Sequence, residues 1–162
     1  MTDKPLLSTE TPAEIAINEE VAGHWELWSN IIGATALPRI ERLREVIPTL
    51  TTAILSTADG LNLCSIGVER DNVGRLAALN SSMYAIASSQ ADLIGRHADA
   101  ESTIVNVSTG NGHFVLASFV QKPLGQLLLG ISAEELQLGM LVVHTRNAVD
   151  DIQKWLTDAQ LH

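Results

Sequence analysis

The stretch that decides the fold runs from Thr51 to Gly67 and reads TTAILSTADGLNLCSIG. Two short apolar runs lie on either side of Ala58-Asp59-Gly60. Aspartate followed by glycine is a strong hairpin signal, because the turn needs positive φ angles that these residues tolerate. We therefore predict two antiparallel strands joined here, and strict alternation along the second strand places Leu63 and Cys64 on opposite faces.

Downstream of this hairpin the sequence predicts a long helix and then three more strands. Asp71 is a candidate N-cap for the helix, which runs to about Ala98. The strands are joined by short turns and are predicted over residues 103–107, 113–120 and 126–131, with Gly110-Asn111-Gly112 as a second hairpin turn. Consecutive strands with short connections are typical of an antiparallel meander.

Two further helices are predicted outside these elements. Leu37, Ile40, Leu43 and Ile47 recur at helical spacing, and Pro48 ends that first helix. Ser132-Ala133-Glu134-Glu135 has the pattern of a capping box that opens the last helix. This order predicts an α+β fold with a five-stranded antiparallel sheet. The long helix then covers one face of the sheet, and the first and last helices cover the other.

The residues before Leu37 are interpreted as an N-terminal extension, 1–36, partly disordered or helical, ahead of a domain over 37–160. Thr11-Pro12 followed by Glu14 is a helix-start signal, whereas Gly23 and Gly33 weaken a helix over this region. Two tryptophans, Trp25 and Trp28, either cover an edge of the core or dock on a partner, since tryptophan is favoured at binding hot spots.

Composition and charge exclude several classes of function. The 162-residue chain has a formal net charge of −9, so we expect no nucleic-acid binding, which needs a basic surface. The single cysteine, Cys64, excludes an internal disulfide and a thiolate zinc cluster. Neither a signal-peptide pattern nor an apolar run long enough to span a membrane is present, so we expect a cytoplasmic protein without a membrane span.

No constellation of residues predicts catalysis. Gly110-Asn111-Gly112 lacks the Gly-Lys-Ser/Thr that completes a phosphate-binding loop. Four of the five histidines, His24, His97, His113 and His144, are scattered and show no metal-ligand spacing. We therefore expect no catalytic, cofactor-binding or metal-ligating residues, no cofactor, and a protein that is not an enzyme.

The long middle helix instead carries two neighbouring stripes. One is apolar except for Gln90 and consists of Leu76, Leu79, Met83, Ile86, Gln90 and Leu93. The other has only small side chains and consists of Ala78, Ser82, Ala85 and Ser89. Small side chains let another backbone come close, and that neighbour is either the protein's own sheet or the helix of a second copy.

From about Leu37 to Leu156 the chain resembles the roadblock family, named for a dynein light chain. The residues that carry the resemblance are Leu43 to Pro48 with Ala53 to Ser56 and Asp59-Gly60-Leu61, the small-residue helix Arg75 to Ala87, the meander from Thr103 to Ile131, and Leu138 to Val142 with Arg146. The resemblance implies a roadblock/profilin-like sheet of strand order 2-1-5-4-3. It also implies a homodimer in which the third strand and the middle helix pair with their twins.

On this chain the interface implied by the resemblance comprises Arg75, Ala78, Ser82, Ala85, Ser89, Arg96, Thr103, Val105 and Val107. The family's partners are Ras-like small GTPases, which implies a non-catalytic regulator or scaffold in bacterial signalling or motility. The alternative is a small-molecule-sensing domain of profilin/PAS-like shape, for which Asn106, Ser65 and Gln90 are the candidate buried polar residues.

Overall fold

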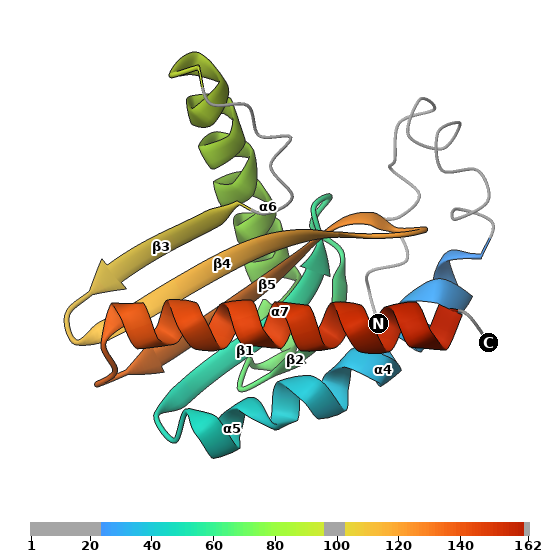
Figure 1. Ribbon diagram of the computed structural model, residues 1–162, viewed down its shortest axis with the longest axis horizontal. Coiled ribbons are helices and arrows are strands. Elements are labelled where there is room, and N and C mark those ends of the chain that lie inside the picture. Colours follow the sequence, from blue (N-terminus) through green and yellow to red (C-terminus); the bar gives the residue numbers. More distant parts are fainter. Residues whose placement is uncertain (1–23, 96–102, 161–162) are drawn as a thin grey trace.

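A computed structural model describes residues 24–95 and 103–160 of the chain (Figure 1). Its helices are α4 (Trp25–Glu41), α5 (Leu43–Val46), α6 (Arg70–Leu93) and α7 (Leu138–Gln160). Its strands are β1 (Leu50–Thr57), β2 (Asn62–Ile66), β3 (Ile104–Thr109), β4 (Gly112–Gln121) and β5 (Gly125–Glu134).

The strands form a 5-stranded antiparallel sheet in the order β2-β1-β5-β4-β3, which confirms the predicted α+β architecture. The hairpin of β1 and β2 therefore lies at one end of the sheet, and β3 lies at the other. One long helix, α6, packs on one face, whereas α4 and α7 pack on the opposite face (Figure 1).

The turn between β1 and β2 forms where the Asp-Gly signal predicts it, and Gly60 has a φ of +94°. The strand alternation after it is less regular than expected. A register shift beside Leu55 and Ser56 interrupts the pairing with β2, and both Leu63 and Cys64 pack against the core. A bulge of this kind turns consecutive side chains toward the same face, so strict alternation was wrong here.

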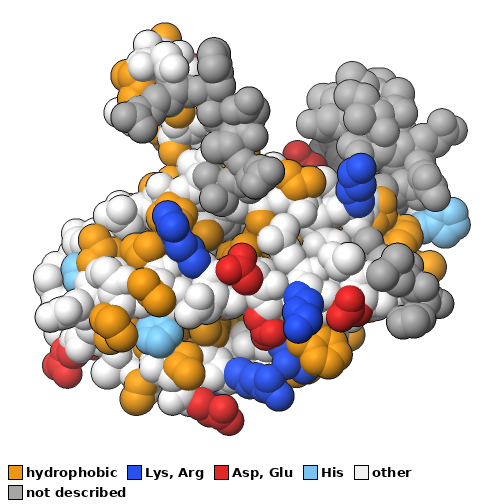
Figure 2. Space-filling model, in the orientation of Figure 1, with side chains coloured by type: hydrophobic (Ala, Val, Ile, Leu, Met, Phe, Trp, Pro, Cys, Tyr) orange, Lys and Arg blue, Asp and Glu red, His pale blue; other side chains and the backbone are white. Residues whose placement is uncertain are grey.

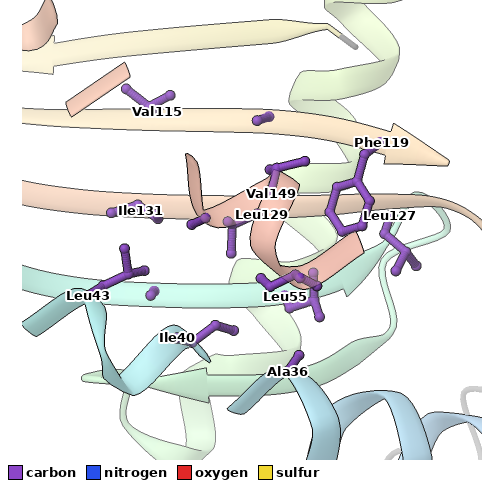
Figure 3. Packing of buried hydrophobic residues seen from close by; sticks show 14 of the residues in the cluster. Ala36, Ile40, Leu43, Leu55, Val115, Phe119, Leu127, Leu129, Ile131 and Val149 are labelled. Carbon is purple, nitrogen blue, oxygen red and sulfur yellow. The ribbon is translucent and has the colours of Figure 1, made fainter. Parts of the chain in front are cut away.

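The core lies between the sheet and the pair α4 and α7 (Figure 3). The sheet contributes Leu55, Phe119, Leu127, Leu129 and Ile131, all fully buried. Their register pairs place them on one face, since Leu55, Leu129 and Ala117 lie directly across from one another. Removing this apolar area from water is the main stabilising contribution to the fold.

Helix α4 approaches β2 closely at a glycine, Gly33, which has no side chain to keep the two backbones apart. A Cβ added at Gly33 would lie 2.5 Å from the carbonyl oxygen of Leu63. Gly33 therefore allows the helix to approach the strand, although glycine is unfavourable within a helix. Ile32, Ala36 and Ile40 fill the space beside it and are buried in the core.

The first helix begins earlier than its spacing indicated. Helix α4 starts at Trp25, and Ile32 and Ala36 belong to the same core as the sheet. The division into an extension 1–36 and a domain 37–160 stays a prediction, but core packing crosses that boundary. Arg39 ties α4 to α7, since its guanidinium lies 4.1 Å from the ring centroid of Trp155 and 4.0 Å from a carboxylate oxygen of Asp151.

Two helix starts differ from the prediction. Helix α6 has Glu69 rather than Asp71 at its N-cap, and Asp71 lies in its first turn. The capping box at Ser132 is wrong, because β5 continues to Glu134 and α7 begins at Leu138. The hydroxyl of Ser132 instead forms a 2.6 Å hydrogen bond with that of Thr51. Pairing with β1 and β4 kept these residues in the sheet despite their capping pattern.

Candidate interaction surface

Helix α6 contacts the sheet through one side, on which only two residues are fully buried, and leaves its opposite side exposed. Ala77 and Asn80 are its buried residues. In Figure 1 the end of α6 that follows them projects beyond the sheet. A helix this long with so little buried surface is expected to use its free faces for another contact.

The small-residue stripe predicted on this helix faces away from the protein's own sheet, whereas the apolar stripe does so only in part, because Leu76 and Met83 are half-buried. Within the apolar stripe, Leu79 is 61% exposed, Ile86 66% and Leu93 87%. The small residues Ala78, Ser82, Ala85 and Ser89 are exposed as well. Figure 2 shows hydrophobic side chains on this projecting part of the molecule. Of the two neighbours considered for the small stripe, the protein's own sheet is therefore excluded.

An open sheet edge accompanies the helix. β3 is the terminal strand of the sheet and pairs only with β4 among the described strands. Val105 pairs with Leu116 and Val107 with Phe114, and these pairs point to the face that α6 covers, opposite the core residues Val115 and Ala117. Val107 is 42% exposed. An unprotected edge of this kind can pair with another strand.

The base of α6 is held by the tip of the first hairpin and by the middle of the sheet. A Cβ on Gly60 would lie 3.3 Å from the Cα of Ala78, and Ser81 donates a hydrogen bond to the carbonyl oxygen of Ala58. A Cβ on Gly130 would lie 2.9 Å from Nδ2 of Asn80. The hairpin thus positions the helix that carries both stripes, although it lies at the far end of the sheet from β3.

The other predicted interface residues divide into three groups. Arg75 is exposed on α6 near its start. Thr103 lies just before β3, where its N–H donates to Oγ of Ser118 at 2.8 Å and its carbonyl oxygen accepts from the Ser118 N–H at 2.9 Å. Arg96 lies outside the described residues. The structure therefore brings most of the predicted set onto α6 and β3, on one side of the sheet.

The sequence did not indicate the polar contacts beneath α6. Asn80 and Ser56 are buried on facing elements, and neither Asn80 Nδ2 nor Ser56 Oγ has a hydrogen-bond partner within the protein. Asparagine inside a helical pattern is usually a solvated residue, so only the close approach at Gly130 identifies Asn80 as the contact with the sheet. Polar atoms buried without partners weaken that contact.

The residues considered for a ligand pocket do not come together. Asn106 is exposed on β3, Gln90 is exposed on α6, and Ser65 is half-buried on β2 at the opposite end of the sheet. Among residues 24–95 and 103–160, no group of three or more histidine, cysteine, aspartate or glutamate side chains could hold a metal ion. Burial raises the pKa of the Cys64 thiol to about 12, which disfavours a reactive thiolate.

None of the helices in the described part of the chain is both long enough and apolar enough to span a membrane. Two neighbouring features of the described residues are open to a partner, the outer face of α6 and the free edge of β3. We call these two features together the α6–β3 surface. It consists of Arg75, Ala78, Leu79, Ser82, Ala85, Ile86, Ser89, Leu93, Thr103, Val105 and Val107.

No family model matches the chain, and no curated protein matches its sequence. Solved structures do match its fold. The roadblock/LC7 domain from Streptomyces avermitilis is 20% identical with a TM-score of 0.60, and the match covers 72% of this chain and 93% of that domain. MglB from Myxococcus xanthus is 16% identical with a TM-score of 0.61, covering 78% of this chain and 90% of that one.

The gliding protein MglB from Thermus thermophilus is 16% identical with a TM-score of 0.63, and the match covers 78% of this chain and 92% of that one. These likenesses show that the chain has the roadblock fold, as the resemblance implied.

Proposed function

We propose that this protein is a non-catalytic homodimer that regulates or scaffolds a Ras-like small GTPase in bacterial signalling or motility. The observation that carries the proposal is the α6–β3 surface on a roadblock fold. One of the structures that share the fold is a gliding protein, which supports a role in motility.

The dimer part of the proposal rests on the exposed apolar side chains of α6 and on the unpaired edge of β3. Leu79, Ile86 and Leu93 are more than half exposed, whereas large apolar side chains gathered along one line are typical of an interface. The adjacent small residues let a second α6 approach closely. If two β3 strands pair edge to edge, the two sheets become one. The backbone N–H and C=O groups at the open edge then gain hydrogen-bond partners.

The GTPase part rests on the resemblance to the roadblock family and on the exposed α6–β3 surface, whose apolar side chains can contact a partner. A dimer built on α6 and β3 presents one continuous sheet with paired helices, which is a broad platform for a globular partner. In this proposal the protein either changes the activity of the GTPase or localises it.

Two measurements test the two parts separately. Light scattering at tens of micromolar is expected to give twice the 17.4 kDa chain mass, and a clean monomer would contradict the dimer. Binding to a Ras-like GTPase from the same organism is then measured with the GTPase loaded with GDP or with a non-hydrolysable GTP analogue. Binding that depends on the nucleotide supports a regulator, equal binding in both states supports a scaffold, and no binding in either state contradicts the GTPase role.

A further inference from the structure

Helix α6 is longer than the sheet that it crosses. It contacts every strand, with Ala78 at the turn between β1 and β2 and Asn80 at Gly130 of β5. From Asn80 the helix continues for thirteen residues to Leu93, which is about 20 Å at ~1.5 Å per residue. Only two strand spacings, about 10 Å, separate β5 from β3. The helix therefore extends up to about 10 Å past β3, on the side where Figure 1 shows it projecting.

We call the part of α6 beyond β3 the overhang, residues 87–93. Its length corresponds to two further strands of a sheet, if the sheet continues past β3. The protein's own sheet ends at β3, so within the described residues the overhang has no sheet beneath it.

The sheet face under α6 also has an open half. Val105, near the start of β3, is half-buried, whereas Val107 further along the same strand is 42% exposed. Phe114 of β4 lies directly across from Val107 on this face and is half-buried. In Figure 1, α6 passes the start of β3 and leaves the other end of the strand uncovered. Apolar side chains on a sheet face are usually covered by a second layer.

A second copy joined through β3 brings its own α6 to this open half. When two antiparallel β3 strands pair symmetrically, the two-fold axis is perpendicular to the sheet and reverses the direction of the strand. A helix that crosses the start of β3 in one copy therefore lies over the end of β3 in the other. The next two strands of the joined sheet are β3 and β4 of the second copy, which is the distance that the overhang spans.

The overhang and the open half also match in chemistry. From Leu76 to Ala91, α6 has no charged side chain. Val107 and Phe114 are apolar, so a contact between the two surfaces buries no unpaired charge. Ala87 and Ala91 lie on the same side of α6 as Asn80, the side that faces the sheet, and their small side chains let the helix lie close to a second sheet.

We propose that in the homodimer the overhang of each copy covers Val107 and Phe114 of the other copy. The inference rests on the proposed homodimer and goes beyond it, because it names the surface that each copy completes for its partner. The two copies exchange a covering layer on the part of the sheet that the helix of the same chain leaves open.

Cross-linking between two variant chains tests the exchange. One chain carries Ala91→Cys, and the other carries Val107→Cys and a tag that changes its mass. The control mixture replaces Ala91→Cys with Asn72→Cys, which is exposed at the opposite end of α6. With a short bismaleimide we expect at least about tenfold more mixed product from the Ala91 pair, because a short linker joins only residues that lie close together. Wild-type protein, which carries only the buried Cys64, gives the background.

Light scattering on the same mixtures separates this inference from the proposed function. A dimer in which the Ala91 and Asn72 mixtures give equal amounts of mixed product would overturn the exchange and leave the homodimer standing. A monomer would overturn both.

Carbene labelling of the wild-type protein gives a second test without any substitution. As the concentration rises and dimers form, labelling of Val107 and Phe114 is expected to fall at least about twofold, because the helix of the second copy excludes solvent from them. Phe114 is the decisive residue, since it lies on β4, which pairing of the β3 strands alone does not cover. Val143, 50% exposed on α7 across the sheet, is the control and is expected to keep its labelling. Unchanged labelling of Phe114 in the dimer would overturn the inference.

Discussion

Replacing Ile86 by alanine tests the dimer with little disturbance of the protomer. Ile86 is 66% exposed on α6, so most of its side chain is free to be buried by a second copy. Ile→Ala removes three carbons, and two thirds of their burial at ~0.8 kcal/mol per carbon gives about 1.6 kcal/mol per copy. In a symmetric interface the change occurs twice, so dimerisation weakens by about 3 kcal/mol, or roughly two orders of magnitude in the dimer dissociation constant.

The stability of the protomer itself is expected to change by less than about 1 kcal/mol, because alanine is a better helix former than isoleucine and little packing is lost. Sedimentation velocity over a range of concentrations measures the dimer dissociation constant, and chemical denaturation checks the fold. Val143→Ala is the matched control, since Val143 is 50% exposed on α7 across the sheet. An unchanged dimer in Ile86→Ala, or an equal loss in the control, would refute the interface.

Three further predictions concern the packing that positions this surface. Gly33→Ala is expected to destabilise the protein by about 1–3 kcal/mol in denaturation, because its Cβ meets the Leu63 backbone, whereas Gly139→Ala, which has open space, is expected to be neutral or stabilising. Gly60→Ala is expected to lower the free energy of unfolding by about 1–2 kcal/mol, since φ is +94° there, and a neutral result would show that the turn can rearrange. The Cys64 thiol is expected to be slow toward a thiol reagent at pH 8 until the protein unfolds. Because its pKa rises from 9.0 to about 12 on folding, the unfolding free energy falls as pH rises through that range, and Cys64→Ala removes this slope.

The sequence predicted the strands well where local signals and neighbouring elements agreed. Asp59-Gly60 and Asn111-Gly112 fix tight turns, and both lie where the structure turns. The predicted capping box at Ser132 was wrong because the local signal and the neighbouring strands disagreed. Its capping pattern is local, but pairing across β1 and β4 kept it in the sheet. Glycines were also misread, because Gly33 weakens a helix in isolation and yet permits the close contact of α4 with β2.

By itself, the sequence determined the order of elements, the five-strand architecture and the presence of two stripes on the middle helix. These follow from turn chemistry and periodicity, which act over a few residues. Which side of that helix faces water depended on the contacts of Ala77 and Asn80 with a sheet assembled from distant segments. Only the tertiary structure could therefore decide that Ala78, Ala85 and Ile86 face outward, because burial depends on what lies opposite a side chain rather than on its neighbours in sequence.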